Sequence, residues 1–366
     1  EARAAGVILG LHHTDLVFLG YPDRGLERLW RGHWDLARPY TSRYTRVAQS
    51  PYPNSYRESA PYAANAVVAD LIALLRDFAP TAIVGPHPND AHPDHWASHC
   101  LLMVALAELA GAGVPAGEAP HYLYLVHRGR WPTPRGARPE LDQAPPRSLL
   151  GLDTEWAVFH LDQGAVATKH DAIKSHHSQV AVMGRYLMSF TRRTELFGRL
   201  PPLPAHRFGE DAPPDWAAVP PVVRSPQRDT LPRRLEGAAD IKSLYLAVRG
   251  EDLLIRVVVR GNLLADVTYR IGLAAFGGER SRGESVFELS LREGHTPRLK
   301  DAQGQVHVAP VLATFRATAV EASLPLRALG RPARLMACAE TVVAFVTVDR
   351  TAWRTVILPV IPAEVC

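Results

Sequence analysis

The fold of the first half of this chain is decided by the stretch Gly85-Pro86-His87-Pro88-Asn89-Asp90-Ala91-His92-Pro93-Asp94-His95. It follows a short apolar segment, residues 81–85, that predicts a buried strand, and precedes residues 96–111, whose apolar spacing predicts a helix. Pro93 suits the first turn of that helix, so His92 is expected to cap it. A turn placed in this way lies at the carboxyl end of a strand, where open α/β sheets bind their ligands.

The side chains of this turn suit a metal site. His92 and His95 are three residues apart, which puts their imidazoles side by side on one helical turn. Asp90 and Asp94 can accept hydrogen bonds from the imidazoles and so determine which ring nitrogen faces a metal. The alternative interpretation of the same residues is a polar, capped helix start with surface histidines.

The segments around the turn are typical of an α/β domain. We expect strands at 14–20, 81–85 and 121–126, an irregular loop at 28–58, and helices at 1–11, 61–78, 96–111, 165–179 and 183–197. This order predicts a Rossmann-like, mostly parallel, doubly wound sheet.

The pattern changes after a proline-dense stretch, residues 201–232, which predicts a linker. Beyond it, short alternating segments separated by glycine and charged turns predict an all-β antiparallel sandwich. The expected strands are residues 243–248, 253–260, 265–275, 285–291, 305–311, 314–319, 335–348 and 354–358. The expected organisation is therefore an α/β domain over residues 1–200, the linker, and a β-sandwich accessory domain over residues 233–366.

Several stretches together resemble the PIG-L, or LmbE-like, family of zinc-dependent N-deacetylases. Residues 86–99 (PHPNDAHPDHWASH) are similar to the second signature of that family, and residues 9–23, 122–132, 169–179 and 190–197 resemble other family segments in the same order. The resemblance covers about residues 1–200 and implies an LmbE-like fold. It also implies a hydrolase that removes an N-acetyl group from a GlcNAc-type or related amide substrate, with Zn²⁺ or another divalent metal activating a water.

The resemblance also implies roles for individual residues. His95 would be a metal ligand, and His92 would stabilise the oxyanion or act as an acid beside the scissile carbonyl. Asp94 would hold His92 and balance its charge, and Asp90 would support the metal site from behind. Asp23 and Arg43 are expected to belong to substrate loops; an ordinary ordered loop is the alternative for the region that contains Arg43.

The first signature of the family, Ala-His-Pro-Asp-Asp, does not occur in this sequence. In the family it supplies a His ligand, an Asp ligand and the general base, on a central first strand. We therefore expect an incomplete site in a fragment of a longer gene product, inactive as it stands. His12, His13 and Asp15 are poor substitutes, because they precede a predicted strand instead of following one.

Composition narrows the possible partners. The 366 residues carry a net charge of +4, with 47% hydrophobic and 21% charged residues, as in globular proteins. The surplus arginine is spread along the chain, which favours a solvated surface over a nucleic-acid interface.

The apolar run at 100–112 is too short for a membrane span and contains Glu108. The three cysteines, Cys100, Cys338 and Cys366, have neither zinc-site nor disulfide spacing.

Two functional hypotheses follow. The first is a metal-dependent deacetylase acting on an N-acetylated sugar or sugar conjugate. The second is a non-catalytic, deacetylase-like protein that binds glycan or a protein partner. Trp353, Tyr245 and Tyr269 are candidates for stacking on a ligand, with packing in the β core as the alternative. A nucleotide-binding Rossmann protein is disfavoured, because no GxGxxG follows a strand. The sequence leaves the compartment, the oligomeric state and the choice of metal open.

Overall fold

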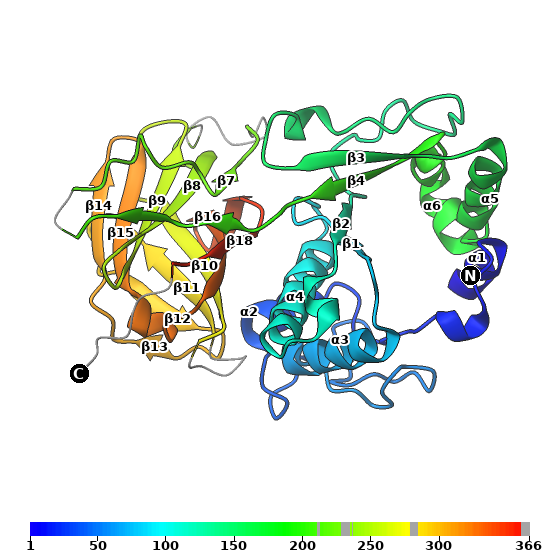
Figure 1. Ribbon diagram of the computed structural model, residues 1–366, viewed down its shortest axis with the longest axis horizontal. Coiled ribbons are helices and arrows are strands. Elements are labelled where there is room, and N and C mark those ends of the chain that lie inside the picture. The colour runs from blue at the N-terminus through cyan, green and yellow to red at the C-terminus, as the bar shows by residue number, and fades with distance from the viewer. Residues whose placement is uncertain (211–212, 228–234, 236, 279–284, 360–366) are drawn as a thin grey trace.

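The computed structural model describes residues 1–210, 213–227, 235, 237–278 and 285–359. Figure 1 shows two parts: a helical part around a small sheet, formed by the first half of the chain, and a β part formed by the second half. The helices are α1 (Ala2–Ile8), α2 (Leu26–Gly32), α3 (Ala64–Phe78), α4 (Pro93–Gly111), α5 (Gln163–Lys174) and α6 (His177–Leu187). The 3-10 turns are η1 (His13–Asp15), η2 (Pro115–Glu118), η3 (Arg147–Leu149), η4 (Met188–Phe190) and η7 (Leu326–Leu329). In the part of the chain described, no helix has the length and apolar character needed to cross a membrane.

The small sheet contains β1 (Ile83–Pro86), β2 (His121–Tyr124), β3 (Glu155–His160) and β4 (Thr194–Arg199), in the order β1-β2-β4-β3. Strands β1 and β2 are parallel, and α4 is the crossover between them. This β1-α4-β2 unit is the strand–turn–helix–strand arrangement that the sequence predicted.

The rest of the small sheet corrects the expectation of a mostly parallel one. Strand β4 pairs antiparallel with both β2 and β3, so within this sheet, as far as it is described, only the β1–β2 pair is parallel. Residues 194–197, predicted as helical, belong to β4, whose side chains alternate between buried and partly exposed. Residues 14–20 form η1 and irregular chain instead of a strand, because no described strand hydrogen-bonds to them.

Helices α3 and α4 confirm the helical periodicity of their segments. Helix α3 buries one apolar stripe and ends at Ala79, which adopts a left-handed conformation with φ of 47°. Helix α4 is buried on nearly all sides because α2, α3, β1 and β10 all pack against it. The expected cap is present, since the His92 ring accepts a hydrogen bond from the Asp94 backbone N–H.

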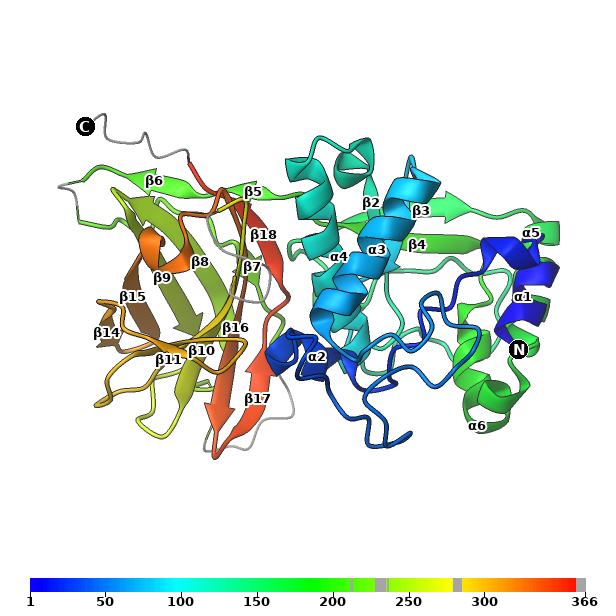
Figure 2. The same cartoon turned by 90° about the horizontal axis from the view of Figure 1, so that it is seen from below.

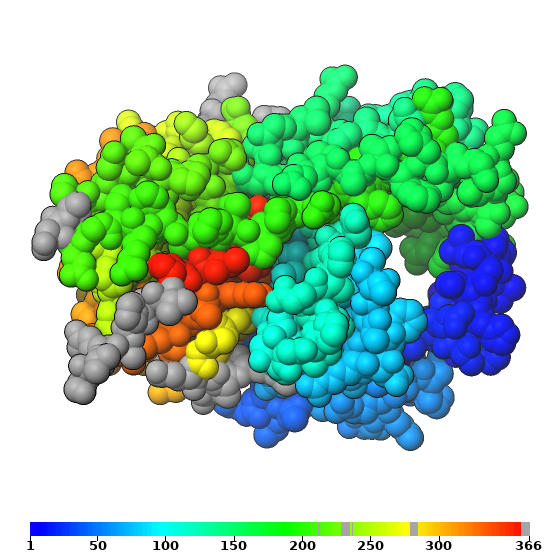
Figure 3. All heavy atoms as spheres, viewed as in Figure 1, coloured from blue at the N-terminus to red at the C-terminus, as the bar shows by residue number. Residues whose placement is uncertain are grey.

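Helix α1 lies against the late helices. The Ser178 backbone N–H donates to Glu1 Oε1 at 2.8 Å, and α1 contacts α5. Figure 3 shows a hollow between this N-terminal segment, in dark blue, and the helices α3 and α4. The four residues 12–15 are exposed at the edge of this segment.

The second half forms two sheets. The larger sheet has the order β13-β12-β11-β10-β16-β18-β5 with β17 beside β16, and the smaller has the order β14-β15-β9-β8-β6 with β7 beside β8. The strands are β5 (Leu203–Pro204), β6 (His206–Phe208), β7 (Val223–Arg224), β8 (Ile241–Arg249), β9 (Asp252–Val259), β10 (Thr268–Phe276), β11 (Val286–Leu291), β12 (Arg298–Asp301), β13 (Val306–His307), β14 (Leu312–Arg316), β15 (Ala319–Pro325), β16 (Arg334–Val343), β17 (Val346–Arg350) and β18 (Arg354–Ile357). All pairings are antiparallel except β5–β18 and β6–β8.

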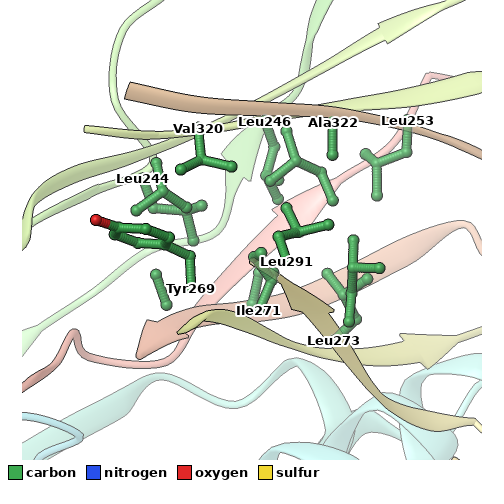
Figure 4. Close-up of a cluster of buried hydrophobic side chains, with 14 of the residues drawn as sticks. Leu244, Leu246, Leu253, Tyr269, Ile271, Leu273, Leu291, Val320 and Ala322 are labelled. Carbon is green, nitrogen blue, oxygen red and sulfur yellow. The ribbon is translucent and has the colours of Figure 1, made fainter. Parts of the chain in front are cut away.

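The two sheets face one another across a shared apolar core. Figure 4 shows Leu244 and Leu246 of the smaller sheet opposite Ile271 and Leu273 of the larger. Tyr269 is buried in this core, and its hydroxyl donates to the Ala238 carbonyl at 3.0 Å. Burial of these side chains is the main stabilising contribution to this part.

The proline-rich stretch 201–232, predicted as a linker, contains three short strands that pair with the two sheets. Strand β5 pairs with β18 of the larger sheet, while β6 and β7 pair with β8 of the smaller sheet. Prolines are compatible with this role because β5 and β6 are edge strands, where a missing N–H donor is tolerated.

The two parts share a continuous interface (Figure 2), in which α2 and α4 cover the outer face of the larger sheet. Strand β16 is therefore buried on both faces: Leu335 and Ala337 face the sandwich core, while Met336 and Cys338 face the helices. The sequence of a strand that is buried on both faces is a nearly continuous run of apolar residues, because neither face contacts water.

Candidate functional site

The candidate site lies where β1 and β2 end. Their parallel register places Pro86 beside Tyr124, so the residues that follow the two strands meet at one edge of the sheet. Two backbone hydrogen bonds join them: the His87 N–H donates to the Tyr124 carbonyl, and the Ala91 N–H to the His127 carbonyl, each at 2.8 Å. Ligand sites form at such edges of α/β sheets.

Three imidazoles cluster at this edge. The ring of His92 lies 4.9 Å from that of His95 and 5.3 Å from that of His127, and the last two are 5.1 Å apart, centroid to centroid. The sequence analysis missed His127. His127 could have been predicted as a site residue from its position directly after the strand that pairs with β1, because neighbouring parallel strands end at the same edge of the sheet.

Asp90 fixes the two loops that carry these histidines. Its Oδ1 accepts from the His92 backbone N–H at 2.8 Å, and its Oδ2 accepts from the Val126 and His127 N–H groups at 2.9 and 3.0 Å. The same Oδ2 lies 3.0 Å from His95 Nδ1. Burial acts to raise the pKa of Asp90, but the close contact with His95 and the backbone hydrogen bonds outweigh it and lower the pKa. Asp90 is therefore a buried carboxylate.

The contacts of His95 and His92 give their rings different free nitrogens. His95 Nδ1 faces a carboxylate, which only accepts, so Nδ1 carries the proton and Nε2 keeps a lone pair. His92 Nδ1 accepts from the Asp94 backbone N–H at 3.3 Å, so a neutral His92 carries its proton on Nε2. His95 thus suits a metal ligand, and His92 suits a hydrogen-bond donor.

Asp94 joins the start of α4 to the turn before α2. Its carboxylate accepts from the Arg24 N–H at 2.5 Å and from the Leu26 N–H at 3.0 Å. Burial raises the pKa of Asp94, and these hydrogen bonds partly offset the effect. Asp23 is exposed on the same turn; Asp23, His92 and Asp94 each offer one atom to a group of possible metal ligands within 4.8 Å of one another.

Arg43 is exposed and bound within its own loop. Its Nη2 donates to the Tyr44 hydroxyl at 2.6 Å, and its guanidinium lies 4.7 Å from the centre of that ring. This hydrogen bond, and the partial charge of Tyr44, raise the pKa of Arg43. Within the described contacts, Arg43 does not touch the histidine cluster.

Aromatic and buried polar side chains form the surroundings of the cluster. Tyr186 stacks on His127 at 5.9 Å, and its hydroxyl donates to the Val126 carbonyl at 2.5 Å. Burial raises the pKa of Tyr186 to about 12 and lowers that of His127, so both are neutral near neutral pH. On the other side His87 is fully buried and stacks on Trp156 at 5.6 Å.

The residues considered as substitutes for the missing signature lie elsewhere. His12 and His13 contact one another in η1, and the His12 backbone N–H donates to the Asp15 carboxylate at 2.8 Å. Residues 12–15 therefore form a surface turn that is stabilised by contacts within the turn.

Comparisons with known proteins give two findings. Residues 1–106 match the family model described as PIG-L: GlcNAc-PI de-N-acetylase. Among solved structures, the chain is similar to a carbohydrate binding module of family 9 from Caldicellulosiruptor kristjanssonii in complex with cellotriose, at 11% identity and a TM-score of 0.30, over 42% of this chain and 93% of that one. No curated protein matches the sequence.

Proposed function

We propose, from the match of residues 1–106 to the PIG-L family model, that this protein is a metal-dependent hydrolase that removes the N-acetyl group from a GlcNAc-type or related amide substrate. The observation that supports the proposal is the division of roles between His95 and His92, which places a free nitrogen lone pair next to an N–H donor. Amide hydrolysis requires both a ligand for the metal and a donor for the oxyanion.

The residues present fit a divalent metal. His95 is prepared as a ligand by the Asp90 carboxylate behind it, an arrangement that orients metal-binding histidines. Asp23 and Asp94 offer carboxylate oxygens that lie within 4.8 Å of each other and of a ring nitrogen of His92. Nitrogen and carboxylate donors suit zinc and several other divalent metals. When bound, the metal would polarise the amide carbonyl and lower the pKa of a water.

The side chains of the chain itself supply the remaining functions. His92 would donate its Nε2 proton to the oxygen that becomes negative in the tetrahedral intermediate. Asp90 keeps both loops and the His95 ring in place, so little reorganisation is needed at the moment of reaction. Tyr186 and His127, both uncharged, limit the approach of water from one side.

Because the 366 residues contain no His-Pro-Asp-Asp, we also propose that this chain alone binds metal weakly and hydrolyses slowly. A catalytic zinc site usually has three protein ligands and one water. His95 as the single assigned ligand falls short of that set, and the exposed Asp23 is grouped with His92 and Asp94 instead.

Two substitutions test the proposal, with metal content and release of acetate from an N-acetylglucosamine conjugate as the readouts. His95→Ala should weaken metal binding by about ten- to a hundredfold or more. His92→Ala should keep the metal but lower turnover by about a hundredfold, as loss of an oxyanion donor does. His12→Ala, at an exposed position, is the matched control and should change neither.

Equal metal content in His95→Ala and the unchanged protein would contradict the ligand assignment. If this chain is too slow to assay, the metal titration alone decides that assignment. Absence of saturable metal binding by the unchanged protein, even at high zinc concentration, would remove the enzyme hypothesis.

The alternative is a non-catalytic protein that binds glycan, and one observation favours it. A hollow of about 660 Å³ on the smaller sheet is lined by Trp216, Tyr245, Arg256 and Glu321, which combine aromatic rings with paired charges. Trp353 and Tyr269, the other candidates for stacking, are buried in the interior. Binding of an N-acetylglucosamine oligosaccharide that Trp216→Ala abolishes, without any metal, would support this function over the first.

A further inference from the structure

We propose that a cavity between the two parts of the molecule binds a small organic anion. The cavity measures about 220 Å³ and is lined by residues of α4, β2, β10, β16 and β18 and by the segment that follows β4. None of its lining residues belongs to the stretch 85–95, so it is separate from the histidine cluster.

Arg354 is the residue that points to a negative ligand. It lines the cavity and is only 5% exposed, yet its Nε and Nη1 atoms have no hydrogen-bond partner among the described residues. Asp153 and Glu155 are near enough to favour its charged form, but Asp153 bonds to Arg224 at 2.9 Å instead. A buried guanidinium without acceptors is unfavourable, because its N–H groups lose water and gain nothing.

Other groups around the cavity also lack partners. The Nε1 of Trp353, which is 4% exposed, has none among the described residues, and neither do His99 Nδ1 and His121 Nε2. The two histidine rings stack at 5.7 Å. Burial lowers the pKa of His121 to about 4, so the imidazoles provide neutral polar groups.

The charge of the lining is positive. Arg199, Arg334 and Arg354 face one carboxylate, that of Glu118, which lies 3.4 Å from Arg334. A ligand with acceptor oxygens and a negative charge would satisfy the unpartnered donors and reduce this excess.

The size and the walls define the ligand further. A volume of about 220 Å³ lies below the usual range for drug-sized ligands, so only a small molecule fits. Met103, Leu106 and Phe276 supply apolar wall, which favours a carboxylate with a short hydrocarbon body over inorganic phosphate. We therefore take butyrate as the probe.

Calorimetric titration of the full chain tests the proposal, with EDTA present so that the histidine cluster holds no metal. Butyrate should bind once per chain, while its neutral isostere butyramide and inorganic phosphate should bind more weakly. Arg354→Gln should weaken butyrate by about ten- to a hundredfold, as loss of a hydrogen bond to a charged group does. Arg298→Gln, at an exposed arginine on β12, is the matched control and should leave the affinity unchanged.

A second measurement keeps the proposal testable if Arg354→Gln does not fold. Butyrate should shift the imidazole NMR signals of His121 in the unchanged protein, because that ring lines the cavity. Absence of saturable butyrate binding, equal binding of butyramide or phosphate, or an unmoved His121 signal would each overturn the proposal.

Discussion

Asp90 holds together the two loops that carry the histidine cluster. Its two carboxylate oxygens receive backbone N–H groups from both loops of the candidate site and lie against His95. The sequence predicted a supporting role for Asp90 from its place before the histidines. It did not predict the hydrogen bonds to Val126 and His127, because those depend on the register of β1 against β2.

His87 leads to a prediction about pH. Burial lowers its pKa to about 3 in the folded protein, against an ordinary value near 6.5. The folded-state pKa is below the unfolded one, so as the pH falls below about 6.5 the unfolded chain binds a proton that the folded chain does not. The contribution of the neutral His87 ring to the free energy of unfolding is therefore fully present above about pH 6.5, and it decreases as the pH falls from there to about 3. Between about pH 7 and pH 5 the loss should be roughly 2 kcal/mol.

Urea unfolding at the two pH values checks this prediction. His87→Asn keeps an acceptor near Nδ1, which bonds the Asn89 backbone N–H at 3.0 Å, but does not titrate. The His87→Asn variant should lose less stability on acidification than the unchanged protein. The control His295→Asn, at an exposed position, should lose as much stability as the unchanged protein. An identical loss in all three proteins would contradict the assignment of the effect to His87.

The burial of Arg192 could not be predicted from residue patterns. Arg192 lies in the segment 183–197, which the sequence predicted to be a helix. It is 1% exposed, and its guanidinium donates to the Pro134 and Gly136 carbonyls of a distant loop. A single arginine carries no sequence signal for such contacts, since they depend on the position of the loop in space.

At the scale of elements, the strength of the periodic signal decided which predictions were confirmed. Helices α3 and α4 are long, and their apolar faces repeat, so their existence was predictable. Strand β3 was missed, and β4 was taken for a helix end, because each is six residues long and is defined by its pairing with the other. In the second half, the alternating pattern predicted β8, β9, β10 and β11, whereas β12 and most of β15 were missed and β16 and β17 were taken for one strand.

Strand β10 gives a prediction at this scale, because it lies between the sandwich core and the helices. A Cβ atom added at Gly272 would lie 2.5 Å from Trp353 Cη2 and 3.0 Å from Cys338 Sγ. Trp353 is buried and packs edge-on against Trp30 at 5.3 Å. Gly272→Ala should therefore cost about 1–3 kcal/mol of stability, as overpacking does.

The urea midpoint at constant slope measures this cost. Gly111→Ala is the matched control, since a Cβ there meets nothing within 4 Å and the residue is helical. It should be neutral or stabilise the protein by up to about 1 kcal/mol. A Gly272→Ala protein as stable as the control would show that the β10–Trp353 contact can open freely.

At the scale of the whole molecule, a buried ion cluster joins the two parts. Glu340 of β16 has a side chain only 3% exposed and pairs with Arg31 of α2 at 2.5 Å and with Arg270 of β10 at 3.3 Å. Burial acts to raise the pKa of Glu340, but the charge of Arg31 and its hydrogen bond help to lower it. This pairing was not predictable from residue patterns, because Arg31 and Glu340 are 309 residues apart along the chain.

Glu340→Gln should destabilise the protein by about 1–3 kcal/mol, because Arg31 and Arg270 lose their buried counter-charge and keep only the more exposed carboxylates of Glu27 and Glu288. The free energy of unfolding in urea is the measurement. Glu251→Gln removes a carboxylate from an exposed pair with Arg331 at 3.7 Å and should cost no more than about 1 kcal/mol. Equal costs for the two variants would mean that the cluster does not hold the parts together.

The crossing of residues 203–208 from one sheet to the other limits how this molecule can be divided by recombination. Strand β5 protects the edge of β18, and two residues later β6 protects the edge of β8. A gene fusion that inherited the chain only from residue 233 onward would carry both edges bare, and bare edges recruit strands from other molecules. The unit that can be transplanted intact therefore begins near residue 200, inside the stretch whose prolines suggest a natural break.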